Sequence, residues 1–247
     1  MALKVSQKDP KHEKKEPLSD RVTVWFSQHL KAIIWVVVLL VLAIGGVYGY
    51  MAWQENTEKK SAEQFQAALT AYQTALNEKE QEIGLGMTAE GLKKLMIETY
   101  PVAEKEFGPL VVPNSKYVGQ KIAKLEFADI SRKSEQADRA LELYIQLIDE
   151  FADDTILQQR VLMVLGGLYE DKQDLARAAE MYKRIIDDEK FVIKDEALFS
   201  IGRVYAQEKN IEESSAAYQR VVDEYATSPY ANLAKSEIAQ LPTALQK

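Results

Sequence analysis

A set of seven residues recurs along this chain at a fixed offset, and this repeat limits the fold more than any other sequence feature. The first copy consists of apolar, aromatic or small residues: Leu162, Leu165, Gly166, Tyr169, Ala178, Tyr182 and Ile185. The second copy begins 36 residues later and has a similar residue at each position: Leu198, Ile201, Gly202, Tyr205, Ser214, Tyr218 and Val221. An internal period of this length is typical of stacked structural repeats.

The spacing within each copy predicts two antiparallel helices. Residues at i, i+3, i+4 and i+7 lie on one face of a helix. We expect Ala178 of the second helix to cross the first helix at Gly166, where only small residues permit a close approach. Ser214 and Gly202 should make the same crossing in the next copy. Asp174 and Asn210 stand where the second helices should begin, as N-caps.

A looser copy precedes these two and resembles them at five positions, offset by 38 residues: Phe127, Ala128, Ala140, Tyr144 and Leu147. Lys124 and Ser131 stand where large residues are usual. The pattern of a large residue, Leu-Gly, Tyr, Ala and Tyr or Phe closely resembles the tetratricopeptide repeat (TPR). This resemblance implies an α-solenoid of about three helix pairs in residues 116–247, which ends in a cap helix near residues 228–241.

Residues 54–115 are expected to form membrane-proximal helices and a partial repeat. One stripe of apolar residues predicts a helix up to about residue 79: Phe65, Leu69, Tyr72 and Leu76. This helix should turn at residues 82–87 and pack on a helix that contains Leu92, Leu95 and Met96. The partial repeat should end near Phe107, with its helix made irregular or split by Pro101.

Residues 32–53 form an uncharged run that predicts a membrane span. A helix of this length crosses the ~30 Å hydrocarbon core of a bilayer. The alternatives are a buried core helix, which rarely stays uncharged on every face, and a cleavable signal peptide, which has a shorter apolar region and a cleavage site. We therefore expect an all-α protein with a single N-terminal transmembrane helix. Residues 1–31 should be a disordered basic tail with a membrane-proximal segment.

Small residues within the run indicate a possible contact between membrane helices. Gly45 and Gly49 have the G-x-x-x-G spacing, with Gly46 beside them, and such glycines let two helices approach closely in lipid. They predict packing against a partner helix or a homodimer. The alternative is that they reflect only the ordinary frequency of glycine in membrane spans.

Composition excludes several kinds of chemistry. The chain has no cysteine, and its two histidines, His12 and His29, precede residue 54, so the body has no disulfide, thiolate metal site, Ser-His-Asp triad or histidine base. Residues 54–247 carry 24 Lys and Arg against 34 Asp and Glu, which disfavours nucleic acid as a partner. We expect no metal, no cofactor and no enzymatic activity. An enzyme that uses carboxylates alone remains as a minor alternative.

A TPR resemblance implies that partners bind in a concave groove lined by the first helix of each pair. The register predicts that seven residues are exposed there: Leu125, Asp129, Arg132, Met163, Glu170, Phe199 and Arg203. Met163 and Phe199 would suit an apolar segment of a client protein. The alternative is that neighbouring helices cover both side chains.

The order of a short basic tail, one span and a small acidic TPR body resembles the YfgM-like family of bacterial inner-membrane proteins. This resemblance implies an ancillary subunit of the SecYEG translocon, whose partners are translocon subunits, periplasmic chaperones or foldases, and exported client proteins. A competing hypothesis is a structural scaffold that holds one fixed partner in an envelope machine for division, secretion or motility.

The distribution of charge predicts a cytoplasmic N-terminus and a periplasmic body, because basic residues near a span favour the cytoplasm. Four lie within about twenty residues on the N-terminal side and two on the C-terminal side: Lys14, Lys15, Arg21 and Lys31, then Lys59 and Lys60. Protease added to intact spheroplasts should therefore degrade the body. A body that is degraded only after the spheroplasts are lysed would reverse this orientation.

Overall fold

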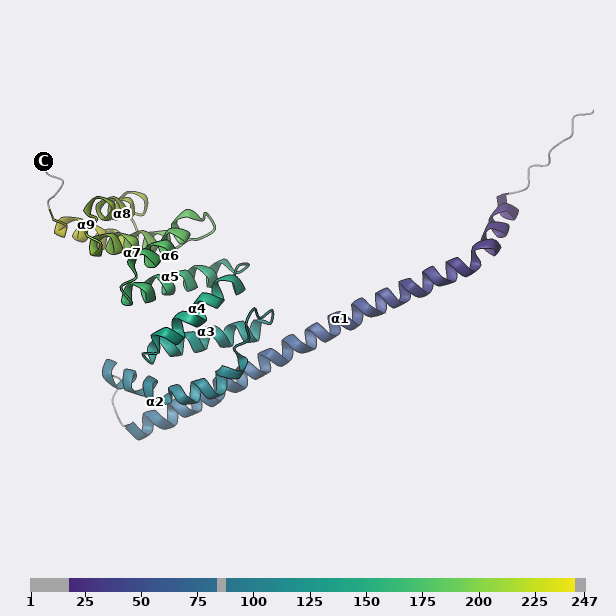
Figure 1. Ribbon diagram of the computed structural model, residues 1–247, viewed down its shortest axis with the longest axis horizontal. Coiled ribbons are helices and arrows are strands. Elements are labelled where there is room, and N and C mark those ends of the chain that lie inside the picture. The colour runs from purple at the N-terminus through teal and green to yellow at the C-terminus, as the bar shows by residue number, and fades with distance from the viewer. Residues whose placement is uncertain (1–17, 84–87, 243–247) are drawn as a thin grey trace, which may run out of the picture. The chain divides into compact units, whose positions relative to one another are not determined.

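The computed structural model describes residues 18–83 and 88–242, and the regular elements within them are all helical (Figure 1). The elements are α1 (Leu18–Ile83), α2 (Ala89–Phe107), the 3₁₀ turn η1 (Gly108–Leu110), α3 (Val118–Lys133), α4 (Ala137–Glu150), α5 (Thr155–Asp171), α6 (Leu175–Asp187), α7 (Lys194–Gln207), α8 (Ile211–Glu224) and α9 (Pro229–Gln240). The chain divides into two compact units, Met1–Asn56 and Thr57–Lys247.

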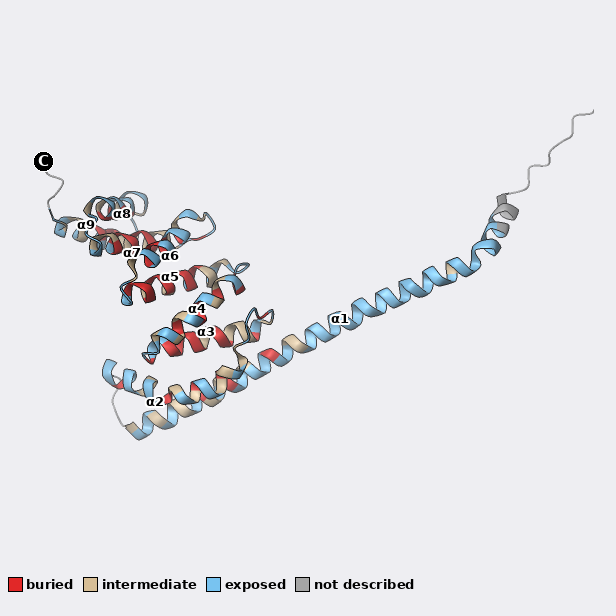
Figure 2. Ribbon diagram, viewed as in Figure 1, coloured by how far each residue is buried: buried red, intermediate tan, exposed pale blue. Residues whose placement is uncertain are grey.

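The first unit contains the N-terminal part of α1, whose large apolar side chains are exposed (Figure 2). An 18-residue window of this helix has a mean hydropathy of 2.7, and none of the window is buried within the protein. Within the described residues it is the one helix long and apolar enough to cross a membrane. Residues 18–31 are helical, whereas residues 1–17 of the expected disordered tail lie outside the described residues.

In the second unit, the C-terminal part of α1 packs on α2. The buried ring of Tyr72 lies 6.0 Å from that of Phe107, edge to face, and the Tyr72 hydroxyl lies 3.9 Å from the sulfur of Met96. The expected contact between the apolar stripe and Met96 is therefore confirmed. Leu92, which was expected to share it, is exposed. Residues 84–87 of the expected turn lie outside the described residues.

Pro101 does not split its helix, contrary to the sequence expectation. Helix α2 runs without a break from Ala89 to Phe107. Proline has no N–H, so the carbonyl of Ile97 loses its helical partner. Ile97 and Pro101 are both exposed, and water can satisfy that carbonyl. Ala103 and Phe107 are buried beyond the proline, and their packing holds the last turn in place.

Three helix pairs and a final helix follow. Helix α3 packs on α4, α5 on α6 and α7 on α8, and contacts between α4 and α5 and between α6 and α7 join successive pairs. Helix α9 packs on α8 at the end of the stack (Figure 1). This arrangement confirms the expected solenoid of three pairs with a C-terminal cap helix.

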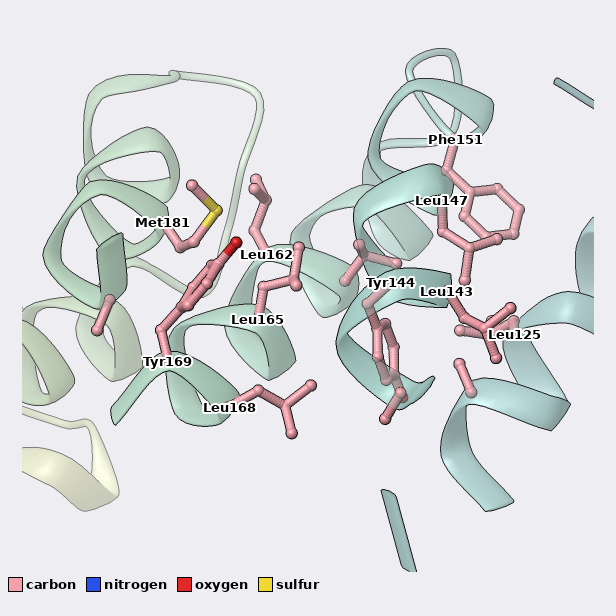
Figure 3. Close-up of a cluster of buried hydrophobic side chains, with 14 of the residues drawn as sticks. Leu125, Leu143, Tyr144, Leu147, Phe151, Leu162, Leu165, Leu168, Tyr169 and Met181 are labelled. Carbon is pink, nitrogen blue, oxygen red and sulfur yellow. The ribbon is translucent and has the colours of Figure 1, made fainter. Parts of the chain in front are cut away.

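A tyrosine ring sets the distance between the two helices of the second and third pairs. Tyr182 is fully buried, and a Cβ placed on Gly166 would lie within 3.0 Å of three of its ring atoms. A Cβ placed on Gly202 would likewise lie 2.7 Å from the nearest ring atom of Tyr218. The tyrosine rings are thus the nearest neighbours of both glycines, Ala178 is fully buried as well, and the hydroxyl of Ser214 donates to the Gly202 carbonyl at 2.8 Å. Figure 3 shows part of the core formed by the first and second pairs.

The turn within each pair has the same backbone geometry. Glu135, Gln173 and Lys209 occupy equivalent positions and have φ values of 63°, 60° and 61°. After each one, the next N–H returns to a carbonyl near the end of the first helix, at 2.8 to 2.9 Å, as in a Schellman motif. Asp174 and Asn210 then cap α6 and α8, as expected from the sequence.

The substitution Gly166→Ala should destabilise the stack, because the added methyl group would overlap the buried Tyr182 ring. The expected loss is about 1–3 kcal/mol in the free energy of unfolding. Gly167→Ala is the matched control, since its Cβ would meet no atom within 4 Å. It should gain up to about 1 kcal/mol from helix propensity. Urea unfolding of the detergent-solubilised chain, followed by circular dichroism, measures both, and equal stabilities would contradict the packing role of Gly166.

Candidate functional site

The residues expected to line a groove lie on α3, α5 and α7, the first helices of the three pairs. We call this surface the first-helix face and define it by the same seven residues: Leu125, Asp129, Arg132, Met163, Glu170, Phe199 and Arg203. The structure brings Asp129 to Arg132 and Glu170 to Arg203. The apolar members are distributed between two packed clusters.

Asp129 is buried and joins three helices. The hydroxyl of Tyr144, on α4, donates to one carboxylate oxygen at 2.6 Å. The guanidinium group of Arg160, on α5, pairs with the other oxygen. Arg132, one turn further along α3, approaches the first oxygen at 3.6 Å. Asp129 therefore connects both helices of its own pair to the first helix of the next pair.

Glu170 makes the same kind of connection one pair further along. The hydroxyl of Tyr182, on α6, donates to it at 2.6 Å. Arg203, on α7, donates to both carboxylate oxygens, at 2.9 and 2.8 Å, and Gln207 adds a contact at 3.2 Å. Two-pronged bonding between a guanidinium and a carboxylate is strong and directional. The two networks, around Asp129 and around Glu170, brace successive pairs against each other.

The expected exposure of the first-helix face is wrong for Leu125, Asp129 and Glu170, which are buried. Met163 is half-buried against the core. Phe199 is also half-buried, and its ring lies 5.4 Å from those of Tyr218 and Tyr230, so neighbouring helices cover it in part. The cause is the close packing of successive pairs and of α9, which the spacing of a single helix does not reveal.

Sequence reasoning missed the partners that occupy this face. Arg160 lies three residues before Met163, on the same side of α5, and forms its ion pair with Asp129 of the preceding pair. The repeat pattern gave no role to the tyrosine hydroxyls, but those of Tyr144 and Tyr182 each donate to a carboxylate. The signal that was available is a buried tyrosine in the second helix combined with an acidic residue on the first.

Electrostatics favour a structural role for both networks. Burial raises the pKa of the Tyr144 and Tyr182 hydroxyls well above the usual range, and the hydrogen bonds to Asp129 and Glu170 raise it further. The bond to Glu170 also raises the pKa of Arg203. The tyrosines are therefore neutral donors and the arginine is charged at neutral pH. In the part of the chain that the structure describes, no three His, Asp or Glu residues are grouped so that they could hold a metal ion.

The candidate membrane-packing residues, Gly45, Gly46 and Gly49, lie in the first unit. A Cβ added to any of them would meet no atom within 4 Å, so the helix surface is open at all three positions. A partner helix for this surface stays a prediction.

Comparison with known proteins agrees with the repeat architecture. Two family models, each described as tetratricopeptide repeat, match residues 125–191 and 196–228. Crystal structures of nearly identical TPR-like repeats from Podosopora anserina, and of a single-residue variant of them, superpose with TM-scores of 0.51 and 0.52. Both have 13% identity and cover 74% of this chain, and 86% and 85% of theirs. No curated protein matches. These findings support a TPR protein, whose fold is that of a protein-interaction scaffold.

The buried tyrosines should make the repeat body sensitive to alkali. The pKa of Tyr144 and of Tyr182 is raised, and burial raises the pKa of Tyr218 to about 12. Unfolded tyrosine titrates near pH ~10, so above this pH the unfolded chain loses protons that the folded chain retains. This contribution to stability is complete below pH ~10 and falls by about 1.4 kcal/mol per pH unit per tyrosine as the pH rises toward the folded pKa.

The replacements Tyr144→Phe and Tyr182→Phe each remove one such group, so the alkaline fall in the free energy of unfolding should become less steep. Urea unfolding of the detergent-solubilised chain between about pH 8 and pH 11 measures this slope. Tyr225→Phe, outside both networks, is the control. If both test variants keep the slope of the parent chain, these tyrosines do not control its alkaline stability.

Proposed function

We propose that this chain is a single-pass membrane protein whose TPR body binds protein partners in the periplasm, as an ancillary subunit of the SecYEG translocon. The observation that carries the proposal is the presence of two features in one chain. One is an exposed helix with a window of mean hydropathy 2.7, and the other is a stack of three TPR-like pairs. The first suits lipid and the second suits protein partners.

Binding accounts for the body better than catalysis does. The two buried carboxylates of the first-helix face are already occupied by tyrosine and arginine donors. A general base needs a carboxylate that can reach a substrate proton. Asp129 and Glu170 instead join successive helix pairs. The outer surfaces of the stack are then the part that can bind partners.

The translocon role is supported by the resemblance in architecture to the YfgM-like family. In this role the helix of the first unit lies beside a channel subunit, with the N-terminus in the cytoplasm. The body then raises the local concentration of exported clients, chaperones or foldases at the channel exit. This role requires no catalysis, because tethering alone raises the frequency with which the body meets its partners.

A scaffold for one fixed partner is the second candidate, and the ion pairs that brace the first-helix face favour it. Arg160 and Arg203 hold the carboxylates of this face, and the ring of Tyr230 packs beside Phe199. Proteins that bind many clients usually present flexible, methionine-rich surfaces. A braced surface is better suited to one partner of matching shape.

Photocrosslinking in living cells tests the proposal. A photoreactive amino acid replaces Gly45 in the open helix, Arg132 or Met163 on the first-helix face, and Glu180 on the exposed side of α6 as the control. We expect translocon subunits from Gly45 and several unrelated exported proteins from Arg132 or Met163. Mass spectrometry identifies the adducts.

The alternatives give different adducts. One abundant partner from the first-helix positions, with no translocon subunit from Gly45, would replace the translocon role with a fixed scaffold. A product of twice the chain mass from Gly45 would instead assign the glycines to a homodimer.

A further inference from the structure

The three most exposed large apolar side chains described in the repeat body occupy one repeat position. Val118, Ile156 and Val192 have 60%, 72% and 77% of their surface exposed. They are offset from one another by 38 and 36 residues, as are the core residues of successive copies. We call these three side chains the apolar ladder. A regular exposed row at the repeat period is unlike the isolated apolar residues found on most protein surfaces.

The apolar ladder follows one edge of the stack. Val118 is the first residue of α3, Ile156 is the second residue of α5, and Val192 lies two residues before α7. The first helices of an antiparallel stack all run in the same direction, so these positions share one end. This is the edge where the chain passes from each pair to the next.

The backbone beneath the ladder is held in place. The N–H of Val118 donates to the carboxylate of Glu58 at 2.9 Å, and the N–H of Val192 donates to the side chain of Gln159 at 3.0 Å. Asp154, two residues before Ile156, caps α5. Side chains on a fixed backbone lose less entropy when a partner covers them, so the row is preorganised for binding.

A cleft of about 790 Å³ opens at the same edge, between the α4–α5 and α6–α7 connections. Its lining includes the apolar side chains of Leu162 and Phe191, and Phe191 directly precedes Val192. The carboxylates of residues 187–189 also line it, together with Arg184 and Lys190, and Lys190 pairs with Asp188. Residues 151–156 and 184–196 together hold seven Asp and Glu against three Lys and Arg. The edge therefore combines apolar contacts with a net negative charge around Ile156 and Val192, whereas the segment around Val118 carries Lys116 and Lys121.

We propose that this edge binds an extended segment of a partner protein in which apolar residues alternate with lysine or arginine. The apolar residues cover the ladder, and the basic ones face the carboxylates of the cleft. Anionic lipid headgroups have the wrong charge for this surface, which favours a protein segment over a membrane. The inference rests on the proposed function only in that the body binds proteins, and it does not require the translocon.

Peptide binding to the full chain in phosphatidylcholine nanodiscs tests this proposal. The probes are fluorescent peptides of alternating Leu and Lys, or of alternating Leu and Glu, and empty nanodiscs give the lipid background. The Leu/Lys peptide should bind at least about tenfold more tightly than the Leu/Glu peptide, and salt should weaken its binding. The double variant Ile156→Ser/Val192→Ser should lose about tenfold in affinity.

Matched variants separate the edge from the rest of the surface. Ile145→Ser/Leu233→Ser changes two exposed apolar residues away from the ladder and should leave peptide affinity unchanged. Asp187→Asn/Glu189→Gln should weaken binding of the Leu/Lys peptide and reduce its salt dependence. Equal affinity in all variants, or a preference for the Leu/Glu peptide, would overturn the proposal.

A membrane contact is tested with the same chain. Because it has no cysteine, Ile156→Cys can be labelled alone with an environment-sensitive fluorophore. Added Leu/Lys peptide should shift its emission to the blue, while brominated lipids in the nanodisc should leave it unquenched. Quenching by brominated lipid would assign the edge to the bilayer and overturn the peptide site. Failure to crosslink the translocon in cells would leave a positive peptide result intact, so the two proposals fail separately.

Discussion

The contact between a buried tyrosine and a glycine is the interaction on which the stack depends. In the second pair the ring of Tyr182 fixes the distance between α5 and α6, because it fills the space a side chain at Gly166 would need. Its hydroxyl also fixes Glu170, which Arg203 of the next pair binds. One residue thus links packing within a pair to the ion pair between pairs. A repeat cannot bury its own apolar face alone, so this double role couples the second pair to the third.

The same contacts decide which surfaces stay available for partners. Arginine side chains reach from one first helix to the carboxylate of the one before, and this occupies Asp129 and Glu170. Helix α9 covers part of Phe199 through Tyr230. A residue of the first-helix face can contact either a neighbouring helix or a partner. In this chain most of the seven contact neighbouring helices. The exposed apolar residues are found instead at the edge where the pairs are connected.

The sequence predicted the helix pairs, their number and the cap helix, because helical spacing and a repeat period are local properties of the chain. It also predicted the caps at Asp174 and Asn210 for the same reason. It failed for Leu125 and Glu170, whose burial depends on how neighbouring pairs approach. It failed for Pro101 as well, since packing of Ala103 and Phe107 outweighs one missing hydrogen bond. Contacts between repeats are set by long side chains, whose reach a periodic pattern does not encode.

The chain presents two apolar surfaces that need different surroundings. The helix of the first unit is uncharged over residues 32–53, so lipid can surround it without burying a charge. Carboxylates line the cleft at the same edge as the apolar ladder. Lipid would have to desolvate them at high cost, whereas a basic protein segment can pair with them. In the proposed function, the first surface anchors the protein in a membrane and the second binds the partner segment. A tethered site of this kind gains occupancy from its local concentration, so even a modest affinity at the edge suffices for function.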